Sequence, residues 1–167
     1  MNRPFRIREA VLGDVTILAE YNLRLAWETE HRRLDPAVVR RGVEALIRDR
    51  TKGEYFVADT DGVASVAPTT GAATGVVGQC CVTYEWSDWR NGNIWWFQSV
   101  YVEAGWRIQG VFRSLFEHVH QAAVHQGVVA LRLYVEEENE NAQEVYRRRG
   151  MARTAYRVFE RELETLH

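Results

Sequence analysis

The sequence predicts an α/β fold in which helices cover a mixed sheet. In the second half of the chain, segments with the two-residue period of strands alternate with segments that have the period of helices. A strongly apolar stretch, from about residue 93 to 102, is typical of a central, buried strand. The chain has 167 residues, of which 46% are hydrophobic, so we expect a single domain over residues 1–167.

The beginning of the chain predicts a strand followed by two helices. Residues 5–8 alternate apolar and charged side chains, as a half-buried strand does. A helix is expected after Asp14, a candidate N-cap, with an apolar stripe that recurs at helical spacing from Val15. Asp35 and Pro36 predict the start of the second helix, because proline suits the first helical position.

The remaining elements follow from the same patterns. Residues 54–59 and 76–85 are expected to form strands. Residues 60–75, rich in Gly, Ala, Ser and Thr, are interpreted as a surface insertion rather than a functional lid. After the strand at 93–102, we expect a helix from Val111, a strand over 129–135, a helix over 139–149 and a final strand over 151–160. The expected order is β-α-α-β-β-β-α-β-α-β.

Charge and composition exclude several classes of function. The net charge of −2 gives no basic field that would favour nucleic acid. The N-terminal residues lack the apolar core of a signal peptide, and the apolar runs are too short to span a bilayer, so we expect no membrane partner. Cys80 and Cys81 are neighbours that a strand would point to opposite faces, which favours reduced thiols and a cytoplasmic location. The five histidines show no ligand spacing, so no metal is expected.

The most informative stretch is a strand that ends near Val102 and runs through a short turn into a helix. The unpaired N–H groups at a helix start, together with the positive end of the helix dipole, suit a phosphate group. Gly110 allows close approach of the backbone, and Arg107 and Arg113 add positive charge. The turn is therefore a candidate phosphate site.

Two blocks of residues together resemble the GNAT superfamily of acyl-CoA N-acyltransferases. The first matches the pyrophosphate loop Q/R-x-x-G-x-G/A over residues 107–112, with Phe112 in place of the final small residue. The second matches N-x-x-A-x-x-x-Y-x-x-x-G-F from Asn139 through Ala142 and Tyr146, with Met151 in place of phenylalanine. On a helix, these offsets of three and seven lie on one face.

The resemblance implies a mostly antiparallel central sheet that is flanked by helices and splayed at its central strands. It also implies that acetyl-CoA is the co-substrate. The expected acceptor is the primary amine of an unknown cationic small molecule or peptide. The residues implied in binding acetyl-CoA are Val100, Tyr101, Val102, Arg107, Ile108, Gln109, Gly110, Val111, Phe112, Arg113, Asn139, Ala142 and Tyr146. The backbones of Val100 and Val102 would pair with the acyl carbonyl and the pantetheine arm.

The implied reaction is direct attack of a neutral amine on the thioester, which needs a base and an acid. Tyr146 is the expected acid for the departing thiolate. Many relatives place a glutamate on the central strand, but residues 94–99 contain no carboxylate. The candidate bases are Glu28, Glu85, or a water molecule held by Gln98 or Ser99.

Other interpretations of the sequence stay open. Four tryptophans lie near Glu85 and Asp88 in the sequence: Trp86, Trp89, Trp95 and Trp96. They either pack in the core and on a surface hairpin, or line an acceptor pocket that attracts a cationic amine. An alternative function is a non-catalytic acyl-CoA sensor or interaction module of the same fold. Exposed tryptophans are also compatible with a homodimer.

Overall fold

The computed structural model describes residues 4–60 and 75–163. The chain divides into two compact units, Met1–Tyr134 and Val135–His167. Most of the expected insertion at 60–75 lies outside the described residues, but its two ends meet, since the N–H of Thr60 donates to the carbonyl of Gly75 at 2.9 Å. That one domain spans the chain stays a prediction.

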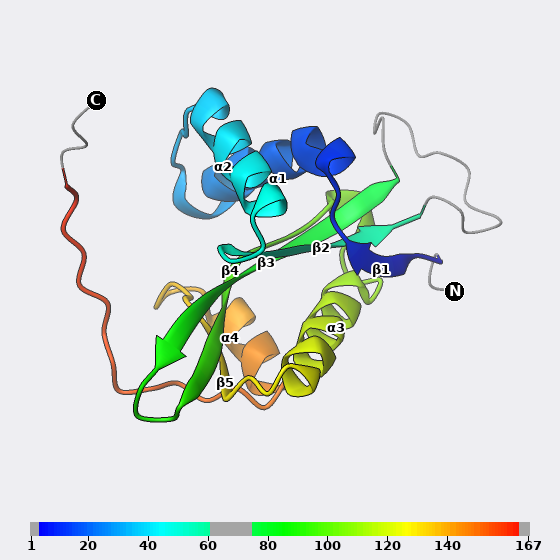
Figure 1. Cartoon of the computed structure of the whole chain (residues 1–167). Helices are drawn as coiled ribbons and strands as arrows, with labels where there is room; N and C mark the ends of the chain where they lie inside the picture. The colour runs from blue at the N-terminus through cyan, green and yellow to red at the C-terminus, as the bar shows by residue number, and fades with distance from the viewer. Residues whose placement is uncertain (1–3, 61–74, 164–167) are drawn as a thin grey trace. The chain divides into compact units, whose positions relative to one another are not determined.

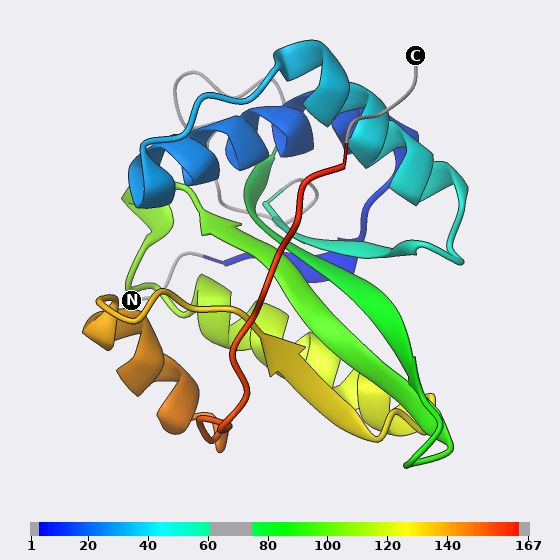
Figure 2. The ribbon, with the colours of Figure 1, turned by 90° about the vertical axis from the view of Figure 1, so that its left-hand side faces the viewer.

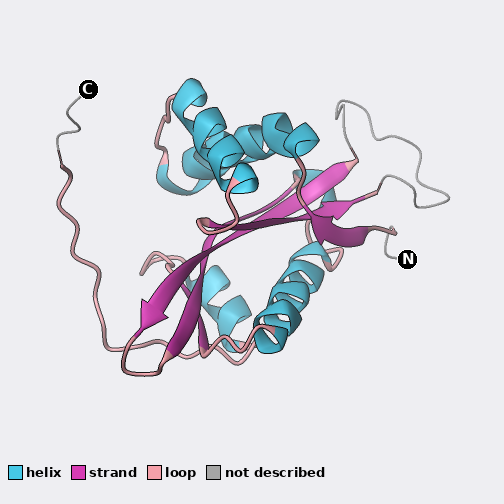
Figure 3. Cartoon of the chain, viewed as in Figure 1, coloured by secondary structure: helices cyan, strands magenta, loops and turns pink. Residues whose placement is uncertain are grey.

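The first unit is built on one five-stranded sheet with the order β1-β2-β3-β4-β5 (Figures 1 and 3). Its strands are β1 (Arg6–Glu9), β2 (Gly53–Asp59), β3 (Val76–Ser87), β4 (Gly92–Val102) and β5 (Ala130–Leu133). Neighbouring strands pair antiparallel except for β4 and β5, which are parallel. The mixed, mostly antiparallel sheet is thus confirmed.

Helices cover both faces of this sheet (Figure 2). The helices α1 (Val15–Glu30) and α2 (Pro36–Arg48) lie on one face, and α3 (Val111–His125) lies on the other. Short 3-10 turns, η1 (Leu12–Asp14) and η2 (Ala104–Trp106), precede α1 and α3. The expected cap of α2 is present, because the Asp35 carboxylate accepts hydrogen bonds from the backbone N–H groups of Ala37 and Val38.

Each face of the sheet has its own apolar layer. On the side of α1 and α2, Leu18, Tyr21 and Val43 are buried in one cluster with residues of β2 to β4. On the side of α3, the rings of Phe97 and Phe116 stack with centroids 5.3 Å apart. The sheet is therefore packed on both faces, with one apolar layer on each side.

A β-bulge interrupts the pairing of β3 with β4. Cys81 pairs with Ser99 and Val82 pairs with Phe97, so Gln98 is an extra residue on β4. An extra residue reverses the alternation of side chains beyond it. Phe97 accordingly packs toward α3, whereas Tyr101 packs against Tyr21 of α1, with ring centroids 4.8 Å apart.

The expected final strand over residues 151–160 is wrong. The described residues 151–163 form no strand, and the large side chains after Met151 are exposed, including Tyr156 and Phe159. A two-residue apolar period makes a strand only where another strand offers its edge. The second unit contains the helix α4 (Glu140–Arg147) and no strand among its described residues.

Candidate functional site

The edge of β4 that faces β5 is paired over only part of its length. β5 contacts β4 from Ile94 to Phe97 and no further. Beyond Phe97, the backbone of β4 keeps its pairing with β3 but has no neighbouring strand on the other side within the first unit. The sheet therefore opens at the bulge, as the expected splay requires.

The backbone groups that face this open edge can be identified from the ladder. The N–H of Glu103 donates to the carbonyl of Val77 on β3 at 3.0 Å, so the backbone of Tyr101, two residues earlier, also faces β3. The backbones of Val100 and Val102 then face the open edge. Arg107 supports this assignment, because its Nε donates to the carbonyl of Val102 at 3.1 Å.

The backbone N–H groups at the start of α3 point out of the end of the helix. The first helical hydrogen bond runs from the N–H of Ser114 to the carbonyl of Gly110 at 3.0 Å, so the N–H groups of residues 111–113 precede it. Gly110 has φ 86°, in the left-handed region that favours glycine. Ile108 also adopts a positive φ, 65°, and its side chain is fully exposed. A turn in this conformation presents amides to an anion.

Two candidate residues, Glu28 and Arg107, are joined in one cluster. Arg107 Nη2 lies 2.6 Å from Glu28 Oε2, and the hydroxyl of Tyr101 donates to Glu28 Oε1 at 2.9 Å. The guanidinium also lies over the Tyr101 ring, 5.6 Å from its centroid. Desolvation raises the pKa of Glu28, but the hydrogen bonds from Arg107 and Tyr101 outweigh it and hold the pKa below its ordinary value. A carboxylate so held is a weakened base.

Glu85 belongs to a different cluster. It accepts a hydrogen bond from Trp96 Nε1 at 2.6 Å and forms an ion pair with Arg132 of β5 at 3.2 Å. Arg132 lies over the Trp96 ring, which stacks on Tyr134 with centroids 4.5 Å apart. Glu85 therefore holds β3 to β5 at the end of the sheet away from the bulge.

The tryptophans near Glu85 do not gather in one pocket. Trp95 is buried in the core, whereas Trp86 and Trp89 are exposed on the β3–β4 hairpin. The interpretation as core packing with a surface hairpin is the one that these positions support.

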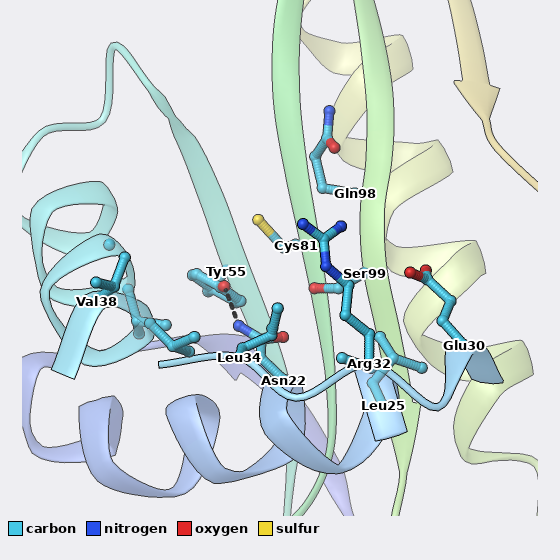
Figure 4. Close-up of a pocket in the computed structure, with 14 residues that line it drawn as sticks. Asn22, Leu25, Glu30, Arg32, Leu34, Val38, Tyr55, Cys81, Gln98 and Ser99 are labelled. Carbon is cyan, nitrogen blue, oxygen red and sulfur yellow. Dashed lines mark hydrogen bonds between the residues drawn. The ribbon is translucent and has the colours of Figure 1, made fainter. Parts of the chain in front are cut away.

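An open pocket of about 490 Å³ instead lies between the two N-terminal helices and the middle of the sheet (Figure 4). The apolar part of its wall comes from α1, α2 and the loop between them: Leu25, Ala26, Leu34, Val38, Val39 and Val43. The strands contribute a polar floor: Tyr55, Cys81, Gln98 and Ser99. Asn22, Glu30 and Arg32 complete the polar lining. The bulge brings Ser99, the neighbour of Val100, into this pocket.

A chain of amides orients the floor of the pocket. Gln79 Nε2 donates to Asn22 Oδ1 at 2.7 Å, and Asn22 Nδ2 donates to the hydroxyl oxygen of Tyr55 at 2.9 Å. Cys81 and Ser99 also lie close enough to this hydroxyl to affect its pKa. The buried Ser99 Oγ makes no hydrogen bond in the described part of the chain. Tyr55 and Ser99 thus place two hydroxyl groups in the lining of the pocket.

A model of the Acetyltransferase (GNAT) family matches residues 20–151. The chain belongs to the GNAT family. The match spans both the start of α3 and the block around Tyr146, so the resemblance seen in these two motifs is confirmed. Membership makes the chain an acyltransferase.

Comparison with solved structures gives the same fold. The chain is similar to a possible acetyltransferase from Clostridium difficile 630, with 39% identity over 98% of this chain and 100% of that one, at a TM-score of 0.82. It shares the fold of a ribosomal-protein-alanine N-acetyltransferase from Brucella melitensis biovar Abortus 2308, with 16% identity over 96% and 100% of the two chains and a TM-score of 0.71. It also shares the fold of AAC(6')-Iy in complex with a bisubstrate analog, CoA-S-monomethyl-acetylneamine, with 16% identity over 96% and 99% and a TM-score of 0.72. A search of curated proteins finds no match.

The second GNAT block lies on α4 in the second unit. Asn139 is the N-cap of α4, since its Oδ1 accepts from the N–H of Ala142 at 3.0 Å. Tyr146 follows Ala142 by four residues on the same helix, as expected. The roles of these three residues toward acetyl-CoA stay predictions.

Several pocket residues were missed by the sequence analysis. Asn22 and Tyr55 fall within ordinary amphipathic patterns, and Arg32 lies in a short charged loop, so no local signal marks them.

Within residues 4–60 and 75–163, no helix is long and apolar enough to cross a membrane. The same residues contain no group of three or more His, Cys, Asp or Glu that could hold a metal ion.

Replacing Arg107 with Gln should raise the pKa of Glu28. Partial desolvation, which raises this pKa, remains in the variant, whereas the guanidinium that lowers it is lost. NMR titration of the Glu28 side-chain carboxyl group measures the change. Arg113→Gln serves as the control, because Arg113 is not among the groups that act on Glu28. An unchanged titration in Arg107→Gln would show that the ion pair does not exist in solution.

Proposed function

We propose that this GNAT protein transfers an acetyl group from acetyl-CoA to a primary amine bound in the pocket between α1, α2 and the sheet. One observation carries the proposal: the bulge at Gln98 makes the open edge of β4 and the floor of the pocket adjacent. Val100 faces the edge, and Ser99, the preceding residue, lines the pocket. Donor and acceptor could thus meet at a single peptide unit.

The first unit carries groups that fit acetyl-CoA. The amides of residues 111–113 and the exposed Arg113 suit the negative diphosphate. Gly110, in the left-handed conformation, has no side chain that would keep the diphosphate away from the backbone. The ring of Phe112 packs toward Phe116, one turn along α3, with centroids 6.1 Å apart. Its bulk therefore lies along the helix, which reconciles the departure from the family motif with a functional turn.

Bound acetyl-CoA would supply a thioester, which is activated toward attack by an amine. The amine nitrogen forms a bond with the acyl carbon, the carbon–sulfur bond breaks, and the amine loses a proton while the thiolate gains one. The N–H of Val100 is the donor that we assign to the acyl oxygen. Tyr146 is the acid that we assign to the thiolate.

A water molecule held by Ser99 and Gln98 is the base that the lining of the pocket favours. Both residues line the pocket, whereas neither Glu28 nor Glu85 does. Glu28 is also bound to Arg107, and Glu85 to Arg132. The two glutamates therefore act, in this proposal, as structural partners of arginines.

Gly110→Glu should abolish binding of CoA, because it places bulk, backbone strain and negative charge at the turn. Isothermal titration calorimetry with CoA measures the affinity. Gly105→Glu is the matched control: it adds the same charge close by, where a side chain would meet open space. Normal affinity in Gly110→Glu would refute the assignment of the turn.

The wild-type protein should release free CoA thiol from acetyl-CoA with at least one member of a panel of primary amines. Tyr146→Phe should slow this release by about 100-fold while CoA affinity changes little, since only the phenol proton is lost. Tyr156→Phe, which alters an exposed tyrosine of the same unit, should behave as wild type. Unchanged turnover in Tyr146→Phe would remove it from the mechanism. Binding of acetyl-CoA without thiol release from any amine would favour the acyl-CoA sensor instead.

A further inference from the structure

The pocket between α1, α2 and the sheet contains a cation, Arg32, that forms no ion pair with the described residues. Arg32, in the loop between α1 and α2, directs its guanidinium toward the strand floor near Cys81 and Ser99 (Figure 4). Within residues 4–60 and 75–163, this guanidinium forms no ion pair or hydrogen bond. Its neighbour Arg33 differs, since it lies over the ring of Trp27, 5.4 Å from the centroid, and does not line the pocket.

The floor opposite Arg32 offers hydrogen-bond donors and no negative charge. The hydroxyl of Tyr55 accepts from Asn22, and burial raises its pKa so that it stays protonated and keeps a proton that it can donate. Within the described part of the chain, Ser99 Oγ meets no hydrogen-bond partner at normal geometry, although Ser99 lies close enough to Tyr55 to lower its pKa. Burial also raises the pKa of the Cys81 thiol to about 12, which keeps it neutral at physiological pH. Donors that converge beside a free guanidinium are the arrangement that binds a carboxylate.

The rest of the lining adds two features. Glu30, the last residue of α1 and two residues before Arg32, is the one carboxylate among the described residues that line the pocket, and it can face an ammonium group. The wall formed by Leu25, Leu34 and Val38 is apolar, and Val38 is 54% exposed, so a bound side chain would cover it. The pocket thus pairs one positive charge, one negative charge and an apolar surface.

We propose that Arg32 binds the carboxylate of the acceptor, and that the acceptor is a free α-amino acid with an apolar side chain. This inference rests on the proposed function and narrows its acceptor. The carboxylate lies between Arg32 and the hydroxyls of Tyr55 and Ser99. The amine, one carbon away, then lies next to Val100, and the side chain covers the apolar wall. The products are an N-acetyl amino acid and CoA.

This assignment replaces the cationic acceptor expected from the tryptophans. A polyamine or other purely cationic amine would leave Arg32 without a partner and bring like charges together. A peptide N-terminus would lack the carboxylate beside its amine. Loss of the carboxylate should therefore weaken binding by about tenfold, which is typical of one hydrogen-bonded charge.

The test compares amino acids with amines that differ only in the carboxylate. Calorimetric titration of the CoA-loaded protein uses L-leucine with 3-methylbutylamine, L-methionine with 3-(methylthio)propylamine, and L-phenylalanine with phenethylamine. We expect at least one amino acid to bind about tenfold more tightly than its matched amine. Arg32→Gln should remove this preference, and Arg33→Gln, the matched control on the same loop, should retain it.

The outcomes separate this inference from the proposed function. If no amino acid binds better than its amine, or if Arg32→Gln keeps the preference, carboxylate recognition by Arg32 is refuted, even if amines are acetylated. If the preference depends on Arg32 but no acyl transfer occurs with acetyl-CoA, the pocket is assigned correctly and the proposed catalysis fails. Because the titration does not require turnover, each result decides its own claim.

Discussion

A single extra residue in β4 determines where the functional groups of this protein lie. Gln98 interrupts the ladder between β3 and β4, so the chain beyond it turns its side chains to the opposite face. Phe97 remains in the layer under α3, while Ser99 and Tyr101 join the layer under α1 and α2. The same residue marks the point where β5 stops pairing. One local irregularity thus produces both an open backbone edge and a pocket floor.

Interactions on both sides keep the bulge in place. The side chain of Gln98 donates to Thr83 Oγ1 on β3 at 2.7 Å, which ties the extra residue to its neighbour strand. Beyond the bulge, the hydroxyl of Tyr101 holds Glu28 at the end of α1, and Glu28 holds Arg107 in the turn before α3. The C-terminal end of α1, next to the pocket, is thereby linked to the candidate phosphate turn.

The sequence predicted the parts of the structure that depend on neighbours along the chain. The caps Asp35 and Asn139 act through backbone groups two or three residues away. The turn from Val102 to Val111 is likewise formed by one uninterrupted stretch of sequence. The two motifs over residues 107–112 and 139–151, which are local in the same way, therefore identified the family. The failure at residues 151–160 has the opposite cause, because strand formation there required a partner that local pattern does not reveal. The pocket escaped detection for the same reason: Asn22, Arg32, Tyr55 and Ser99 come from four separate elements that only folding brings together.

Amide hydrogen exchange along β4, followed by NMR with and without acetyl-CoA, tests the central claim most directly. In the free protein, the amides of Ser99 and Tyr101 should exchange slowly, because they bond to β3, whereas those of Val100 and Val102 should exchange fast. Saturating acetyl-CoA should slow exchange at Val100 and Val102 selectively. If these two amides are already protected in the free protein, or if acetyl-CoA leaves them unchanged, the open edge is not the site of the acyl donor.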